Sequence, residues 1–224
     1  MDNHIITELQ RLLCKNSNDG YGFLTDDSLN YHINHITEKY QFLFIKSGIK
    51  IWNALYFGDF ITKLNNKAFQ KTEFNKTCFE IPDNISYILI PLNHAKHWSL
   101  CIWKILKSNN QITSANIYYI DPLHNGGNWN FWEPLLPRFF YTLIEVKYPN
   151  FLPNLKINQY IVPVKNTQPN MYDCGPYTIS YMMEFILGIQ IGHTWFDHKL
   201  YRHNYAYHLV SLWVEKIKNS FKCK

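Results

Sequence analysis

A single cysteine stands where a helix is predicted to begin, in the stretch QPNMYDCGPYTI at residues 168–179. Pro176 suits the first turn of a helix, where its missing N–H breaks no hydrogen bond, and Gly188 suits the position just beyond the last turn. Unpaired N–H groups at a helix N-terminus carry about half a positive charge and stabilise a thiolate. Cys174 is therefore a candidate nucleophile, although a small residue that only fills the start of a helix would show the same pattern.

A thiolate nucleophile needs an imidazole to move its proton, and the imidazole needs an acidic group to orient it. His97 begins the predicted strand HWSLCIWKIL, and Asp121 ends the predicted strand SANIYYID. If the polar turn KSNNQ is centred on Asn109, antiparallel pairing places His97 directly opposite Asp121. We therefore predict a general base and its orienting acid. Taken separately, a polar residue at a strand edge and a turn former before Pro122 would explain the two positions.

An oxyanion stabiliser is also needed for acyl transfer, and Gln168 is the candidate. It precedes Cys174 by six residues, and we expect it at the end of the strand QYIVPVKN. Its side-chain amide would act together with the backbone N–H of Cys174, whereas an ordinary loop glutamine is the alternative. His94 competes with His97 for the role of base, but we expect it to lie in a loop.

The elements that must position these residues change character along the chain. Helices, a small sheet and further helices follow one another, which predicts an α+β fold in one domain, residues 1–224. Thr25 or Asp26 would cap the second helix. We predict helices over 1–15, 25–40, 51–64, 128–148 (broken near Pro134 and Pro137), 176–187 and 205–221, and strands over 86–92, 97–106, 114–121 and 159–164.

The composition excludes several classes of protein. Aromatic residues make up 17% of the chain, which argues for a sizeable core and against disorder. The net charge of +5 is scattered over lysines without a basic stripe, so we expect no nucleic-acid binding. No apolar run is long enough for a membrane span, and no secretory signal is visible.

The five cysteines are expected to be reduced thiols of a cytosolic protein, and Cys101 is expected to be a core residue. Four late histidines (193, 198, 203 and 208) recur every five residues, which does not align them on one helical face for a metal.

The motifs HW, YYID and QPNMYDCG occur in this order and together resemble the Ulp/sentrin-protease group of cysteine proteases, which process SUMO, ubiquitin and related modifiers. The resemblance covers roughly residues 20–190. It implies a variant of the papain-like cysteine protease fold, with a small mixed sheet flanked by helices and the nucleophile at the start of a central helix. It requires no metal or organic cofactor. It implies the roles already assigned to Cys174 (nucleophile), His97 (general base and acid), Asp121 (orienter) and Gln168 (oxyanion donor).

The same resemblance implies three substrate contacts. Trp98 would cover the Gly-Gly tail of the modifier, because glycine alone lacks the Cβ that would block a closed aromatic tunnel. YGFLTDDSLNYHI resembles the Trp-Leu-x-Asp motif of the family, and Phe23 stands where the family usually has tryptophan. Phe23 would form the other wall of the tunnel, and Asp26 would hold a basic residue of the tail. The alternative is that Trp98 and Phe23 are only core aromatic residues and Asp26 is only a helix cap, in which case none of them contacts a substrate.

The function expected from the resemblance is a thiol isopeptidase, a deubiquitinase that cleaves after the C-terminal Gly-Gly of ubiquitin or a ubiquitin-like modifier. A protease specific for SUMO or another modifier is the near alternative, and residues 40–82 are expected to select the modifier. The chain is compact, and its amino-acid composition is typical of an AT-rich genome. In both respects it resembles bacterial effectors that act in the host-cell cytosol. We expect a monomer. An effector-type acetyltransferase would use the same cysteine but usually has Glu at the position of Asp121. An inactive modifier-binding module would not need an intact Cys174 or His97.

Overall fold

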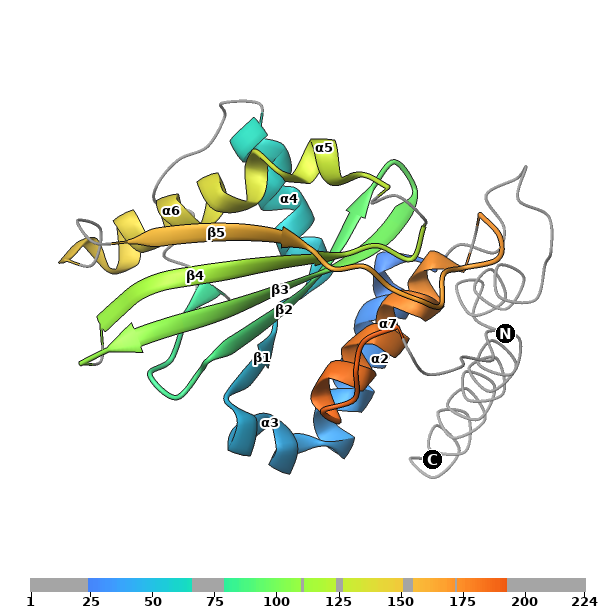
Figure 1. Cartoon of the computed structure of the whole chain (residues 1–224), viewed down its shortest axis with the longest axis horizontal. Coiled ribbons are helices and arrows are strands. Elements are labelled where there is room, and N and C mark those ends of the chain that lie inside the picture. The colour runs from blue at the N-terminus through green and yellow to red at the C-terminus, as the bar shows by residue number, and fades with distance from the viewer. Residues whose placement is uncertain are drawn as a thin grey trace, which may run out of the picture.

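A five-stranded mixed sheet forms the centre of the molecule, with its strands side by side in chain order. The computed structural model describes residues 24–65, 79–109, 111–123, 127–150, 155–171 and 173–192 (Figure 1). The inner strands β2, β3 and β4 are antiparallel, whereas β1 and β5 run parallel to their neighbours. The strands are β1 (Ile49–Ile51), β2 (Tyr87–His94), β3 (His97–Ser108), β4 (Gln111–Ile120) and β5 (Lys156–Ile161).

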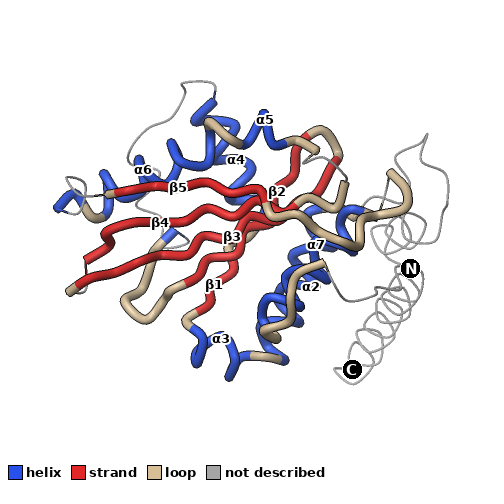
Figure 2. The backbone as a smooth tube through the Cα atoms, viewed as in Figure 1, coloured by secondary structure: helices blue, strands red, loops and turns tan. Residues whose placement is uncertain are grey.

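Helices cover the two faces of this sheet (Figure 2). One face packs against α4, α5 and α6, and the other against α2 and α7. The α+β prediction is confirmed, with the sheet between two layers of helix. The helices are α2 (Asp26–Lys39), α3 (Gln41–Ser47), α4 (Ala54–Asn65), α5 (Trp129–Trp132), α6 (Leu135–Lys147) and α7 (Cys174–Ile186).

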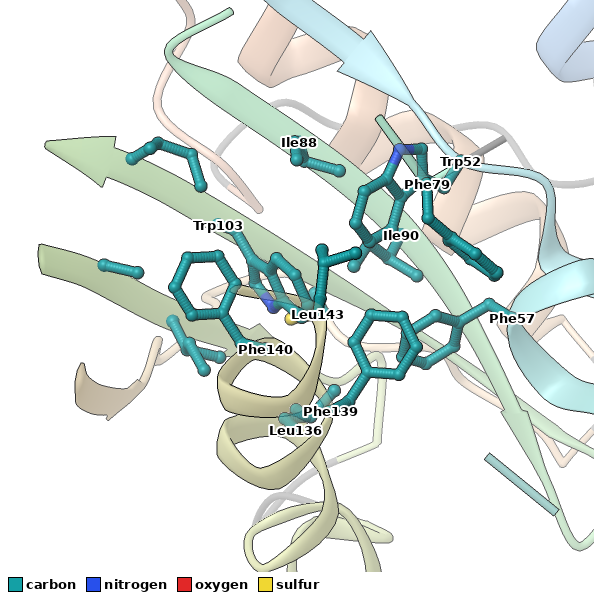
Figure 3. Close-up of a cluster of buried hydrophobic side chains, with 14 of the residues drawn as sticks. Trp52, Phe57, Phe79, Ile88, Ile90, Trp103, Leu136, Phe139, Phe140 and Leu143 are labelled. Carbon is teal, nitrogen blue, oxygen red and sulfur yellow. The ribbon is translucent and has the colours of Figure 1, made fainter. Parts of the chain in front are cut away.

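An aromatic cluster fills the layer between the sheet and α6 (Figure 3). Trp103 of β3 meets Phe140 edge to face, with ring centroids 4.8 Å apart. Phe139 contacts Phe57 of α4 in the same geometry, also at 4.8 Å. Each fully buried side chain of this size stabilises the fold by about 1.5–3 kcal/mol. The cluster therefore holds β3 and β4, which carry two of the candidate site residues at their ends, against a rigid support.

The opposite face of the sheet holds α7. Its apolar side chains, such as Tyr181 and Met182, are buried in one cluster with Leu100 and Ile102 of β3. These side chains give α7 a wide apolar face against the sheet. Because α7 packs along β3, the N-terminus of the helix comes to lie beside the first residues of the strand, and Cys174 approaches His97.

Several predicted boundaries were wrong. The helix predicted over 51–64 begins at Ala54, because residues 49–51 form β1 beside β2. Pro137 does not break α6, since it lies in the first turn, where its missing N–H would have no partner within the helix. The break falls at Pro134, directly before the first residue of α6. The last predicted strand runs from Lys156 to Ile161 instead of 159–164.

Some predictions fall outside the described residues. They are the helices over 1–15 and 205–221, Phe23 and the four late histidines. Within the described ranges, no helix combines the length and the apolar character that crossing a membrane requires.

Candidate active site

The candidate nucleophile, Cys174, is the first residue of α7, and its side chain is fully buried. Asp173 precedes it as the N-cap residue, and its backbone oxygen accepts the first helical hydrogen bond from the N–H of Tyr177 at 3.1 Å. Asn170 holds the approach to the helix, because its side chain donates to the Asp173 carboxylate at 2.6 Å and accepts from the Asp173 N–H at 2.9 Å. The sulfur is thereby fixed at the positive end of the helix.

Gly175 allows the segment before α2 to pack directly on this helix. A Cβ at this position would lie 2.8–2.9 Å from three side-chain atoms of Leu24, which is closer than real contacts allow. The backbone oxygen of Leu24 accepts a hydrogen bond from Trp98 Nε1 at 2.8 Å, and the Trp98 side chain is 1% exposed. Leu24, Trp98 and Cys174 belong to one buried cluster. The segment that resembles the family's tail-binding motif therefore lies beside the candidate nucleophile.

His97 is positioned by a tight turn between β2 and β3. Ala95 and Lys96 form a two-residue connection with φ of +52° and +62°, the left-handed backbone of a type I′ hairpin turn. His94 pairs with His97 at the end of this ladder, so the prediction that it lies in a loop was wrong. The His94 ring stacks on Phe131 with centroids 3.5 Å apart, and burial lowers its pKa.

The predicted register between the strands of His97 and Asp121 is wrong, but the predicted contact between the two side chains is present. Near the site the ladder pairs Leu100 with Ile120, and Asp121 follows directly after β4 ends. The strands lie two residues from the predicted alignment: the turn shifts it by one, because Ser108 pairs with Gln111, and the register irregularity between Leu106 and Lys107 shifts it by a second. Because side chains alternate with a period of two, this shift leaves Asp121 on the expected face. His97 Nε2 lies 2.7 Å from Asp121 Oδ1.

The Asp121 carboxylate is buried and accepts three hydrogen bonds. Oδ1 accepts from His97 and from the backbone N–H of Leu123 at 2.8 Å, and Oδ2 accepts from the Tyr119 hydroxyl at 2.6 Å. Gly127, at φ of +44°, lies against the same carboxylate, since a Cβ there would overlap Oδ2. Sequence reasoning missed Tyr119 and Gly127. A signal for Tyr119 was present, because a residue two positions before Asp121 on a strand shares its face.

His97 has a strongly perturbed pKa. Burial favours the neutral imidazole, but hydrogen bonds to Asp121 and Cys174, together with their charges, raise the pKa of His97 from 6.5 to about 9. The His97 side chain is 10% exposed. Because Nε2 is occupied by Asp121, the other ring nitrogen, Nδ1, is the atom left to exchange a proton with the Cys174 thiol. The site therefore favours an imidazolium beside a sulfur.

Gln168 lies in the loop that leads into α7. It is seven residues beyond the end of β5, so the prediction that it ends a strand was wrong. Its backbone N–H donates to the Pro122 oxygen at 2.9 Å, which ties the loop to the turn that carries Asp121. Its buried side-chain Nε2 donates to the Asn170 oxygen at 2.5 Å. A primary amide has two N–H donors, so the second can serve an oxyanion.

Asp26 lies in the first turn of α2, but it is not the cap. Thr25 is the N-cap residue, and its hydroxyl accepts from the Ser28 N–H at 3.2 Å. Burial raises the pKa of the Asp26 carboxyl, against a hydrogen bond from the Asn93 side chain. Among the described residues, no group of three or more His, Cys, Asp or Glu side chains is arranged to hold a metal ion.

Comparison with known proteins agrees with this architecture. The sequence profile of the Ulp1 protease family, C-terminal catalytic domain, matches residues 55–209. This profile is that of a cysteine protease domain, and a sheet that holds an acid and a histidine beside a helix with an N-terminal cysteine fits it. The chain belongs to the Ulp1 protease family. No match was found among curated protein sequences.

Solved structures share the fold at low sequence identity. A de-sumoylating protease is 18% identical with a TM-score of 0.69, and the match covers 96% of this chain and 88% of that chain. The Ulp1 protease domain in complex with Smt3, the yeast orthologue of SUMO, is 18% identical with a TM-score of 0.57, over 94% and 95% of the two chains. The Xanthomonas campestris effector XopD bound to ubiquitin is 15% identical with a TM-score of 0.51, over 83% and 90%.

Proposed function

We propose that this protein is a thiol isopeptidase that cleaves after the C-terminal Gly-Gly of ubiquitin or a ubiquitin-like modifier. The observation that carries the proposal is the His97 ring, which Asp121 holds at 2.7 Å on one nitrogen and which is hydrogen-bonded to Cys174. Cys174 Sγ attacks the carbonyl carbon of the terminal glycine, and His97 gives its proton to the leaving lysine amine. Water then attacks the thioester, His97 accepts a proton from that water, and the carboxylate leaves as the thiolate is restored.

Gln168 is the proposed oxyanion donor, together with the backbone N–H of Cys174. The carbonyl oxygen gains negative charge during both attacks, and preorganised donors stabilise it without reorganising. The free second N–H of the Gln168 amide supports this role. The hydrogen bonds from the Gln168 backbone to Pro122 and from its side chain to Asn170 support it further, because they restrict the loop before the substrate binds.

The proposed tail channel is formed by Trp98 and the segment from Phe23 to Asp26. Cys174 has no exposed surface, so any substrate that reaches it must be narrow, and two successive glycines without Cβ atoms meet this need. The Trp98–Leu24 hydrogen bond supports a channel roof that is held in place. Asp26 would pair with a basic side chain of the tail at the mouth of the channel.

The modifier itself is proposed to be selected by residues 40–82. In the described part of this region, α3 carries two large apolar side chains that face solvent, Phe42 at 73% and Ile45 at 64% exposure. Exposed apolar groups of this kind are typical of protein-binding surfaces. Ubiquitin is the first candidate and SUMO the second. The protein is proposed to act in the cytosol, which is the cytosol of a host cell if the protein is a bacterial effector. It is proposed to be a monomer.

Probes with an electrophile at the C-terminus of ubiquitin or SUMO test the proposal. The protein is expected to form a covalent adduct at Cys174 with at least one probe, detected as a mass increase equal to the probe, and Cys174→Ala is expected to form none. Tight binding of a modifier without an adduct would instead indicate an inactive binding module. Acetyl transfer from acetyl-CoA without an adduct would indicate an acetyltransferase, an alternative that membership of the Ulp1 protease family does not favour.

A further inference from the structure

Tyr119 is a buried tyrosine whose hydroxyl contacts the candidate site through Asp121. It lies on β4, is 0% exposed, and its ring packs in the aromatic layer against Trp129 with centroids 5.1 Å apart. Its hydroxyl donates to Oδ2 of Asp121 at 2.6 Å, a short distance typical of a hydrogen bond to a charged acceptor. Phenylalanine would fill the same space in this layer, so packing alone does not account for the hydroxyl.

The geometry points to Tyr119 as a positioning residue for the reaction: its hydroxyl fixes the plane of the Asp121 carboxylate so that Oδ1 stays directed at His97 Nε2. This inference rests on the proposed function, in which Asp121 orients the general base. It adds a fourth member to the set formed by Cys174, His97 and Asp121, and this member acts through the carboxylate without touching the substrate.

The need for such a device follows from the freedom of an aspartate side chain. The last torsion of aspartate is broad, so the carboxylate plane is weakly set by its own bonds. Here Oδ1 accepts from both His97 and the Leu123 N–H, while Oδ2 is held by Tyr119 and lies against Gly127. Each oxygen therefore has its own partners, and rotation of the carboxylate would break all of these hydrogen bonds together.

The Tyr119 hydroxyl also remains a donor at any working pH. Burial, with the nearby charge of Asp121, raises the pKa of Tyr119 well above its usual value of 10.0. The proton therefore stays on the phenol oxygen, and the hydrogen bond keeps one direction, from tyrosine to aspartate. A group that changed its protonation state near neutral pH would not hold the carboxylate in this way.

The test compares Tyr119→Phe with Tyr118→Phe in the full chain. Tyr118 is the adjacent residue on β4, but it faces the opposite side of the sheet and stacks on Tyr160, away from Asp121. In Tyr119→Phe we expect the NMR resonance of the His97 Nε2 proton to move upfield and the pKa of His97 to fall from about 9 toward 6.5. With a modifier substrate, kcat is expected to fall about tenfold with KM unchanged, which corresponds to one lost charge-assisted hydrogen bond.

Tyr118→Phe is expected to leave the His97 resonance, its pKa and kcat unchanged. An unaltered or raised pKa of His97 in folded Tyr119→Phe would overturn the inference, because a tyrosine that was purely structural, or that only withdrew charge from the carboxylate, would behave in that way. The NMR readout needs no turnover, so it still decides the role of Tyr119 if the protein cleaves no modifier and the proposed function fails.

A second variant applies if Tyr119→Phe does not fold. Incorporation of 3-fluorotyrosine at position 119 keeps the ring and the hydroxyl but makes the phenol a stronger hydrogen-bond donor. 3-Fluorotyrosine at position 118 is the control. We expect a change in the His97 resonance for the label at 119 only. Equal or absent changes at both positions would contradict the positioning role.

Discussion

His97 Nε2 lies 2.7 Å from Asp121 Oδ1, although the two residues are not partners in the β3–β4 ladder. The ladder ends at Leu100 and Ile120, and both side chains reach beyond it from the ends of neighbouring strands. The contact depends on strand ends that a rigid core supports, and three other groups hold the carboxylate or lie against it. The strength of this pair determines the protonation state of the imidazole.

The first prediction concerns the charge on Asp121. Asp121→Asn keeps the size of the side chain but removes the negative charge that helps to raise the pKa of His97. We expect the pKa of His97 to fall toward 6.5 and kcat to fall about 10²–10⁴-fold, the range for loss of general acid–base catalysis. NMR titration of the imidazole and steady-state kinetics measure the two effects. Asp83→Asn, remote from His97 in a surface turn, is the matched control and should change neither.

The second prediction concerns stability against pH. The pKa of His97 is higher in the folded protein than its unperturbed 6.5, so the folded state binds this proton more tightly. The resulting stabilisation is fully present below pH 6.5 and is lost as the pH rises through about 9. The difference corresponds to roughly 3 kcal/mol.

Denaturant unfolding of the wild type and of His97→Gln, at intervals from about pH 6 to about pH 10, isolates this contribution. The free energy of unfolding of the wild type should fall relative to that of the variant across this range. Parallel curves would contradict the raised pKa. Cys174→Ala should lose part of the effect, because the sulfur contributes to the pKa of His97.

The sequence predicted which of the candidate residues come together better than it predicted the register between their strands. Cys174, His97 and Asp121 could be selected because helix-start signals and alternating strands specify which residues stand at element ends. The register could not be predicted, because neither the exact centre of the turn nor the irregularity between Leu106 and Lys107 has a signature in residue type. The predicted contact is nevertheless present, because an error of two residues leaves each side chain on the same face of its strand.

Other features of the structure leave too little signal in the local sequence to be predicted from it. The strand β1 is three residues long, which is too short for a period to appear, and it forms only by parallel pairing with β2, from which 35 residues separate it. The Asn170 contacts that hold Gln168 and Asp173 are side-chain hydrogen bonds within an irregular loop. Such contacts follow from the final packing of the chain and not from periodicity.

The third prediction concerns the close approach of α7 and the tail segment. Gly175→Ala places a Cβ within 2.8–2.9 Å of three Leu24 atoms, one of which is the Leu24 Cβ next to the backbone. The segment must therefore move, and we expect a loss of about 1–3 kcal/mol in the free energy of unfolding. Reaction with the modifier probe should slow more than this loss of stability explains, because Leu24 also anchors Trp98.

Gly58→Ala provides the matched control for this change. Gly58 lies within α4, and nothing lies within 4 Å of the Cβ that alanine would add. We expect the free energy of unfolding to rise by about 0.5–1 kcal/mol, since alanine is the better helix former, and the rate of the probe reaction at saturating probe to be unchanged. Equal effects of the two variants on the probe reaction would contradict a specific contact between Leu24 and the helix.

The fourth prediction concerns the loop that carries Gln168. The Tyr181 hydroxyl of α7 donates to the Asn166 oxygen at 2.7 Å, and the Asn166 N–H donates to the Gly192 oxygen at 2.8 Å. The Gly192 N–H in turn donates to the buried Glu184 carboxylate at 2.6 Å. The helix that begins with the candidate nucleophile therefore also anchors the loop two residues before the candidate oxyanion donor.

Tyr181→Phe removes one link of this chain while keeping the buried ring. The loop should lose part of its preorganisation, so we expect kcat to fall about 3–10-fold with KM nearly unchanged, as for a weakened interaction that acts in the transition state. Steady-state kinetics on a modifier fused to a fluorogenic leaving group measure this split. Tyr141→Phe, at an exposed position of α6, should leave both constants unchanged. A rise in KM at constant kcat in Tyr181→Phe would instead indicate that the loop serves substrate binding, and the anchoring role would have to be abandoned.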